Sequence, residues 1–221
     1  PESVQTLLVT FDELDQTAQT VSDIIGAGIL PAALELLDQL TMNMVEDAAG
    51  LGLPREAAGT LLIEVDGVKE ACDKEIKKII EKAEANGATS VEQAETQQDR
   101  DRLWAARRSV YGVYAKLSSD IFSEDITVPP SKVPAMIRKM IDIAGRHDLK
   151  IGMVAHAGDG NMHPMIPTDQ NNKEEWHRVE KAFEEIVTEA AKMNGTLSGE
   201  HGIGLSKTPF LPLVMDEDSI E

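Results

Sequence analysis

Apolar positions divide the first 96 residues into alternating strands and helices. Leu14, Ala18, Val21 and Ile25 recur at helical spacing, and Asp12 before them is a favourable N-cap, so this stretch is predicted to be an amphipathic helix. The apolar runs on either side are short and bounded by turn residues, which is typical of strands. The predicted strands cover residues 6–11, 32–37, 60–67 and 90–96, and the predicted helices cover 13–26, 42–49 and 68–85.

The same order returns in the second half of the chain. Val133, Met136, Ile137, Met140 and Ile143 lie on one side of a predicted helix that follows a short strand ending at a double proline. Two strands and a further amphipathic helix come next. The predicted helices here cover residues 97–117, 131–144 and 174–193, and the predicted strands cover 126–129, 150–156, 161–167 and 196–198.

A βαββαβ order that occurs twice predicts an α+β fold of two tandem ferredoxin-like subdomains, each with its own antiparallel sheet, joined by a long helix. The tail after the second unit reads as helical but incomplete. The predicted divisions are a first subdomain at 1–96, a connecting helix at 97–123, a second subdomain at 124–206 and a truncated helical segment at 207–221.

Composition narrows the classes of partner. The net charge of −18 disfavours binding to nucleic acid or to an anionic membrane surface. There is no run of about 18 apolar residues of the kind that spans a membrane. Cys72 is the single cysteine, so no disulfide forms within the chain, which fits a reducing compartment. Both ends of the sequence read as cuts in a longer protein.

Three of the five histidines lie in two short segments, HAGDGNMH at 156–163 and SGEHGIG at 198–204. Asp159-Gly160 favours a two-residue hairpin turn, which would place His156 and His163 directly opposite each other on one face. Two imidazoles at that spacing are suited to one divalent metal. The alternative is that both histidines are hydrogen-bonded structural residues.

Glu200 is the candidate third ligand, because two histidines and one glutamate leave a metal position free for water or substrate. Histidine and carboxylate ligands suit zinc, manganese and iron alike. His201 is next to it and is the candidate general base. Asn161 is a candidate to orient a ligand, with capping of the turn as the equal alternative.

HAGDGNMHP and SGEHGIG resemble the two signatures of the C-terminal cap domain of FAD-linked oxidases in the vanillyl-alcohol oxidase superfamily. The resemblance is strongest to the glycolate oxidase flavin subunit and D-lactate dehydrogenase branch. It covers nearly the whole chain, including the segments PAALELLD, GTLLIEVDG, RDRLWAARR and EDITVP.

The resemblance implies that Arg107, in the family's W-x-x-R motif, binds the substrate carboxylate. From the residues alone, Arg107 reads as one solvated helix arginine among several. At positions where the D-2-hydroxyglutarate branch has further polar groups for a second carboxylate, this chain has Ser123 and Tyr111. This difference favours a short monocarboxylic 2-hydroxy acid, with a D-2-hydroxyglutarate-type dehydrogenase as the alternative.

As a hypothesis, the 2-hydroxy acid loses its hydroxyl proton to His201 and its hydride to FAD, giving the 2-oxo acid. The sequence has no glycine-rich phosphate loop of the kind that a flavin pyrophosphate needs. The resemblance implies that FAD is held by an N-terminal domain of the same protein, so we expect no turnover by this chain alone. The residues that contact FAD stay unknown. The resemblance also implies an iron-sulfur or electron-transfer subunit as partner and a cytoplasmic location, peripheral to the inner membrane through such subunits. Rival classes are a metal-dependent hydrolase or lyase and a non-catalytic module.

Overall fold

The first half of the chain folds as a βαββαβ unit in the computed structural model, which describes residues 1–116 and 118–220. Its strands are antiparallel and lie in the order β4-β1-β3-β2, as in ferredoxin-like folds. These elements are β1 (Ser3–Phe11), α1 (Leu14–Gly26), β2 (Ala33–Asp38), α2 (Gln39–Ala49), β3 (Gly59–Gly67), α3 (Lys69–Ala85) and β4 (Ala88–Gln93). Glu13, and not the predicted Asp12, occupies the N-cap position of α1.

The second unit repeats this arrangement with a reduced fourth strand. β7 and β8 form the hairpin, β6 pairs with the far side of β8, and the predicted strand at 196–198 is a single bridge between Thr196 and Thr127. The elements are β6 (Ile126–Thr127), η1 (Pro130–Lys132), α5 (Val133–Arg146), β7 (Gly152–His156), β8 (Asn161–Thr168) and α6 (Lys173–Lys192). The predicted α+β fold of two ferredoxin-like units is thus confirmed.

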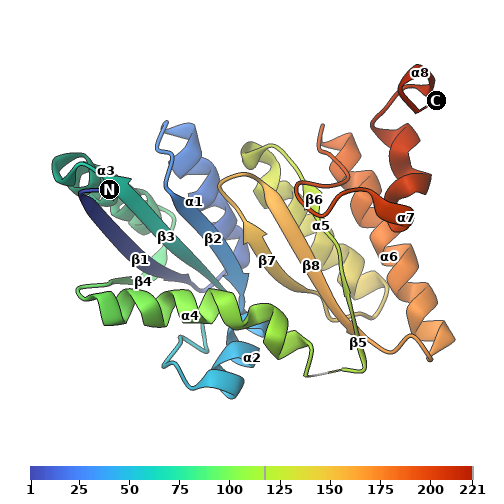
Figure 1. Ribbon diagram of the computed structural model, residues 1–221, viewed down its shortest axis with the longest axis horizontal. Helices are drawn as coiled ribbons and strands as arrows, with labels where there is room; N and C mark the ends of the chain where they lie inside the picture. Colours follow the sequence, from blue (N-terminus) through green and yellow to red (C-terminus); the bar gives the residue numbers. More distant parts are fainter. Residues whose placement is uncertain (117, 221) are drawn as a thin grey trace.

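The predicted division into two sheets is wrong in one respect, because β2 pairs with β7 and joins the units into one continuous sheet (Figure 1). The junction consists of three residue pairs, Glu35 with His156, Leu36 with Ala155, and Leu37 with Val154. Pairing satisfies the backbone groups of two strands that would otherwise be sheet edges. The predicted domain boundaries stay predictions.

Sequence reasoning missed one strand, β5 (Asp120–Ser123), which pairs with the C-terminal part of β8. β5 and β6 keep the same register against β8, and the interruption between them lies opposite Pro164. Proline has no N–H to donate to a ladder, so the pairing stops there. The interruption leaves Asp125 opposite His163.

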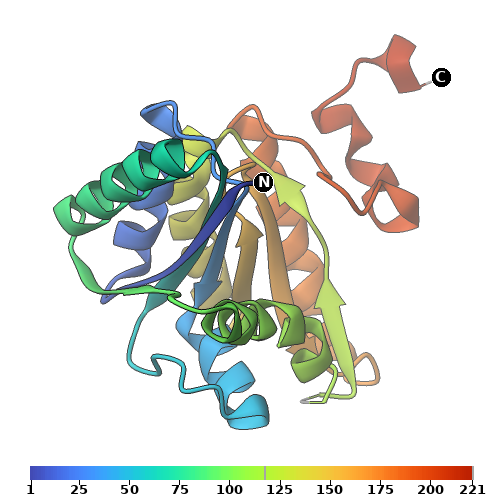
Figure 2. The same cartoon turned by 60° about the vertical axis from the view of Figure 1, so that its left-hand side comes forward.

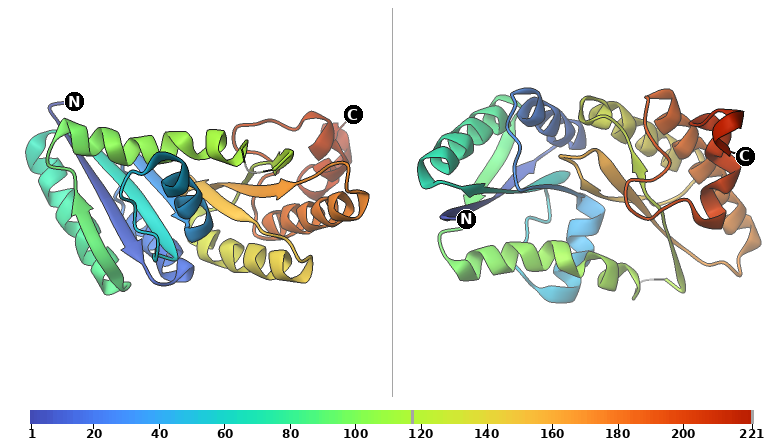
Figure 3. Two further views of the ribbon diagram at one scale, coloured as in Figure 1. Left: turned by 90° about the horizontal axis from the view of Figure 1, so that it is seen from below. Right: turned by 45° about the horizontal axis from the view of Figure 1, so that its top comes forward.

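Helices cover the two faces of the sheet unequally (Figures 2 and 3). α1, α3, α5 and α6 lie on one face and enclose the larger core, whereas α2 and the connecting helix α4 (Gln97–Tyr114) lie on the other. α4 begins with a capping box between Thr96 and Asp99. Its predicted end at Leu117 lies outside the described residues.

The C-terminal segment continues past α6 as three short helical pieces that extend away from the sheet (Figure 1). These are α7 (Gly204–Lys207), η2 (Thr208–Leu213) and α8 (Glu217–Ile220). Phe210 packs edge-on against Phe183 of α6, with ring centroids 6.0 Å apart. Among the described residues, no helix combines the length and apolarity needed to cross a membrane.

Candidate metal and substrate site

The hairpin between β7 and β8 differs from the predicted two-residue turn. His156 pairs with Asn161 and His163 pairs with Val154, so the loop is four residues long and the two histidines are diagonal neighbours. Diagonal neighbours still share a face of the sheet. The imidazole rings meet edge to face with centroids 5.3 Å apart.

The tip of the hairpin explains the longer loop. The N–H of Asp159 donates to the carbonyl of His156, and the N–H of Gly160 donates to the carbonyl of Ala157, which gives two overlapping turns. Gly160 has a φ of 74°, and a Cβ there would lie 1.9 Å from the carbonyl oxygen of Val128. The glycine is required by this close backbone approach.

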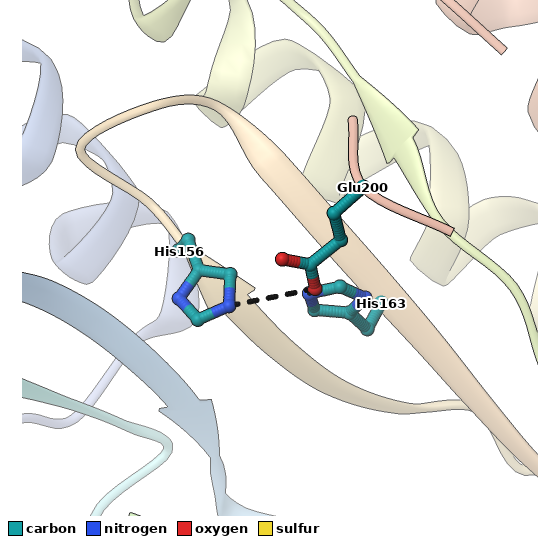
Figure 4. Close-up of side chains that lie close together, drawn as sticks. All are labelled: His156, His163 and Glu200. Atoms are coloured by element: carbon teal, nitrogen blue, oxygen red, sulfur yellow. Dashed lines mark ion pairs between the residues drawn. The ribbon is translucent and has the colours of Figure 1, made fainter. Parts of the chain in front are cut away.

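Glu200 brings a carboxylate to the two histidines from a loop remote in sequence (Figure 4). Its Oε1 lies 3.2 Å from Nε2 of His163 and 3.6 Å from Nε2 of His156. One ligand atom from each of the three residues lies within 4.8 Å of the others. The structure therefore brings the three predicted metal ligands together.

His163 is the residue that most needs a ligand. Its side chain is 0% exposed, and within the described part of the chain neither ring nitrogen makes a well-aligned hydrogen bond, although Oε1 of Glu200 lies 3.2 Å from Nε2. A buried polar atom left unpaired is costly, whereas a divalent ion at Nε2 would satisfy it. Two imidazoles and one carboxylate are a donor set that fits zinc, manganese or iron.

Glu35, on β2, orients the other histidine and was missed by sequence reasoning. Its carboxylate lies 2.7 Å from Nδ1 of His156 and accepts a 2.6 Å hydrogen bond from Nε of Arg107. Burial by itself would raise the pKa of Glu35, but the bonds from His156 and Arg107 hold this pKa below its usual value. An ionised Glu35 fixes the proton on Nδ1 of His156 and leaves Nε2 free to bind a metal.

The pKa values of the two histidines are shifted in opposite directions. Burial, with smaller contributions from the neighbouring His156 and His201, lowers the pKa of His163 to about 4. The hydrogen bond to Glu35 raises the pKa of His156. His163 is therefore neutral near pH 7, which is the form that binds metals.

The metal-free chain is expected to lose stability in acid because of His163. Below about pH 6.5 the unfolded chain binds a proton at this residue that the folded chain rejects until about pH 4, so the free energy of unfolding falls by about 3 kcal/mol across that range. Urea titrations of wild type and His163→Gln at several pH values measure this, because the difference removes contributions common to both proteins. Parallel curves for the two proteins would contradict the assignment.

The position of Arg107 is fixed by polar contacts between α4 and the sheet. Glu64 on β3 accepts hydrogen bonds from Arg100 (2.8 and 2.9 Å) and from the indole N–H of Trp104 (2.8 Å), which holds α4 on the sheet. Arg107 follows one turn after Trp104, and its Nη2 lies 3.5 Å from Nε2 of His156. The predicted carboxylate-binding arginine thus lies beside the predicted metal ligands.

His201 lies on the other side of His163, and the two rings stack with centroids 5.1 Å apart. Its side chain is 33% exposed, and its Nε2 is 3.8 Å from Oε1 of Glu200. The predicted base is thus next to the ligand group and open to a substrate.

Asn161 is less accessible, at 5% exposure. Its side-chain oxygen accepts a hydrogen bond from Thr127, and a Cβ at Gly199 would lie 2.6 Å from its Cγ. Asn161 packs against the SGEHG loop at Gly199. Its predicted role in binding the substrate stays a prediction.

A second cluster with the spacing of metal ligands consists of Glu124, Asp125 and His201. A lysine ammonium already occupies the position beside its two carboxylates. The ammonium of Lys207 contacts Asp125 and lies 3.1 Å from Glu124. Sequence reasoning missed Lys207, which is 0% exposed, because a lysine in a polar tail gives no sign of burial.

The family model described as "FAD linked oxidases, C-terminal domain" matches residues 1–221. The glycolate oxidase subunit GlcD of Bacillus subtilis (strain 168) is 43% identical over 221 residues, 100% of this chain and 47% of that protein. The D-lactate dehydrogenase of Archaeoglobus fulgidus is 29% identical over 215 residues, 96% of this chain and 45% of that protein.

Solved structures show the same fold at low identity. Substrate-bound p-cresol methylhydroxylase matches with a TM-score of 0.65 at 12% identity, over 99% of this chain and 48% of that one. Alkyldihydroxyacetonephosphate synthase matches with a TM-score of 0.62 at 14% identity, over 97% of this chain and 44% of that one. The chain spans about half the length of the curated relatives it matches.

Proposed function

This chain belongs to the family of C-terminal domains of FAD linked oxidases, and from that premise we propose that it binds the substrate and a divalent metal in an FAD-dependent 2-hydroxy acid oxidoreductase. The proposed reaction is of the glycolate or D-lactate type, in which the 2-hydroxy acid becomes the 2-oxo acid. The relatives named as glycolate oxidase subunit and D-lactate dehydrogenase support this substrate class. FAD is proposed to bind to a separate domain of the same protein.

The observation that carries the metal proposal is the buried His163 between His156 and Glu200. His156, His163 and Glu200 would hold the ion. Glu35 supports this role by fixing the proton on the far nitrogen of His156. When bound, the metal would lower the pKa of the substrate hydroxyl, and FAD would accept the hydride.

Arg107 and His201 are the residues proposed to act on the substrate itself. Nε of Arg107 is engaged by Glu35, and the terminal nitrogens, of which Nη2 has a long 3.5 Å contact to His156, are proposed to bind the substrate carboxylate. Nε2 of His201 receives the proton of the substrate hydroxyl, since this imidazole is exposed and adjacent to Glu200. Arg107 contacts His156 and His201 stacks on His163, so the two side chains are proposed to hold one small molecule beside the histidine pair.

Tyr111 supports a preference for short substrates. It lies one turn after Arg107 on the same side of α4. A tyrosine side chain carries no positive charge, so Tyr111 offers no cation to a second carboxylate. A D-2-hydroxyglutarate-type activity is the less favoured alternative.

The proposed assembly follows from the same relatives. GlcD is named as a subunit of glycolate oxidase, and we propose that this protein also works with a partner subunit, an iron-sulfur or other electron-transfer protein. A cytoplasmic location, peripheral to the inner membrane through such partners, is proposed with it.

Metal removal tests the proposed function in the longer flavoprotein that contains this chain. Glycolate or D-lactate is expected to bleach the flavin absorbance under anaerobic conditions, and dialysis against a chelator should slow bleaching by about a thousandfold or more. Zinc, manganese and ferrous iron are then added back separately to identify the ion. If bleaching is unchanged after metal loss has been verified, the metal role is refuted. If the protein instead hydrolyses an ester or amide substrate without reducing the flavin, the rival metal-dependent hydrolase is supported.

A further inference from the structure

The segment that carries Glu200 and His201 has no helix or strand of its own. Residues 197–203 form neither, yet this loop must present a carboxylate and an imidazole beside His163. Both side chains are substantially exposed, at 48% for Glu200 and 33% for His201. Their positions therefore depend on what holds the backbone beneath them.

The carboxylate of Asp125 holds that backbone. It accepts hydrogen bonds from three consecutive N–H groups, those of Gly199 (2.7 Å), Glu200 (2.7 Å) and His201 (3.2 Å). The hydroxyl of Ser198 donates to the same carboxylate at 2.9 Å. A loop whose N–H groups converge on one anion has its backbone direction fixed at each of those residues.

Lys207 completes this arrangement from the far end of the loop. Its ammonium donates to the carboxylate of Asp125 and, at 2.8 Å, to the backbone carbonyl of the same residue. Both side chains are 0% exposed. Without Lys207, the buried carboxylate would keep its negative charge with no cation to balance it.

Neither member of the pair is placed to act on a ligand. The ammonium of Lys207 is enclosed by Asp125 and Glu124, and the carboxylate of Asp125 is turned to the loop backbone. An isolated buried ion pair is weak evidence for a stabilising role, because desolvation offsets the attraction. The three N–H bonds, in contrast, end on the residues that carry the ligand and the base.

We propose that Asp125 and Lys207 are a positioning pair that holds Glu200 and His201 in place for metal and substrate, and this proposal rests on the proposed function. Lys207 balances the charge of the Asp125 carboxylate and holds it toward the loop, and Asp125 fixes the loop backbone. Breaking the pair therefore weakens metal binding without removing any ligand atom.

Lys207→Met tests the proposal, with Lys192→Met as its matched control. Lys192 is a surface lysine, 64% exposed, with one ion pair of its own to Glu189 at 2.8 Å. Zinc affinity is measured by calorimetry well below the melting temperature of each variant, so that only folded protein is compared. Lys207→Met is expected to weaken zinc binding by at least about tenfold, as substitutions behind metal ligands do, and Lys192→Met is expected to leave it unchanged.

Hydrogen exchange at residues 199–201 gives a readout that does not depend on metal. These amides are expected to be protected in the wild type and to exchange selectively faster in Lys207→Met. Should Lys207→Met fail to fold, Ser198→Ala keeps the ion pair and removes the hydroxyl contacts to Asp125 and to the N–H of Gly202. It should weaken zinc binding several-fold with the same selective exchange.

Zinc affinity equal to wild type in a folded variant would mean that the pair only stabilises the fold, and the proposal would be overturned. If the wild type binds no metal, the proposed function fails, and hydrogen exchange alone decides the positioning role. Selective exchange at 199–201 would then support it, and exchange that rises equally throughout the chain would reject it.

Discussion

Replacing both His156 and His163 by alanine is expected to abolish metal binding and to lower turnover of the flavoprotein by at least about a thousandfold. The double substitution leaves Glu200 as the single remaining ligand of the proposed three, and one carboxylate on an exposed loop binds a metal weakly. Elemental analysis of the purified variant measures the metal. About one equivalent in the wild type and none in the variant is the expected result.

One control substitution and one test substitution separate metal binding from catalysis. His177→Ala changes a surface histidine, 69% exposed, and should leave metal and turnover unaltered. His201→Ala should keep the metal and lower turnover by about a hundred- to ten-thousandfold, the range for loss of a general base. Full activity in His201→Ala would reject its role as base, and one equivalent of metal in the double variant would reject the hairpin site.

The second large effect is expected at Arg107. Arg107→Met should lower kcat/KM for glycolate or D-lactate by about a hundred- to thousandfold, since a charge-assisted contact to the substrate carboxylate is lost and Glu35 loses one of its two partners. Steady-state kinetics at saturating metal measures this. Because Arg107 no longer offsets the effect of burial, the pKa of the Glu35 carboxyl should also rise.

Arg108→Met is the matched control, because Arg108 is the next residue of α4 and is exposed. Its recorded contact is a 3.4 Å bond to the carbonyl of Asp101. Equal losses in the two variants would mean that Arg107 contributes only general positive charge. A change in metal affinity with an unaltered KM would place its action on His156, through Glu35, and not on the substrate.

Much of the fold follows from local pattern. The helical spacing of α5 and α6 and the apolar runs of β1 and β3 appear within a few residues of their predicted bounds, because each element buries one continuous face. β5 escaped notice because its four residues, DIFS, are only half-buried and show no strong alternation. The junction of β2 with β7 is a pairing between distant strands, which no local pattern encodes.

The candidate site was predictable to the extent that its residues cluster in sequence. His156, His163, Glu200 and His201 come from two short motifs, and the structure brings them together as expected. The exact cross-strand pairing failed because the hairpin tip folds as two overlapping turns, which lengthen the loop to four residues.

The supporting residues were harder to find. Glu35 lies within the buried strand ALELLD, where a lone carboxylate among apolar residues is a sign that could have been noticed. Asp125 and Lys207 satisfy each other through contacts that arise only on folding, and neither has a local signature.

The three-pair junction between β2 and β7 also bears on ancestry. The metal ligands and His201 all come from the second unit, and Glu35 of the first unit contacts His156 across the junction. A single ancestral βαββαβ unit would have exposed that strand as an open edge, which tends to pair with another copy. An edge-to-edge dimer of such units would already bring a carboxylate on one strand beside a histidine on the other, and gene duplication and fusion would keep that contact within one chain.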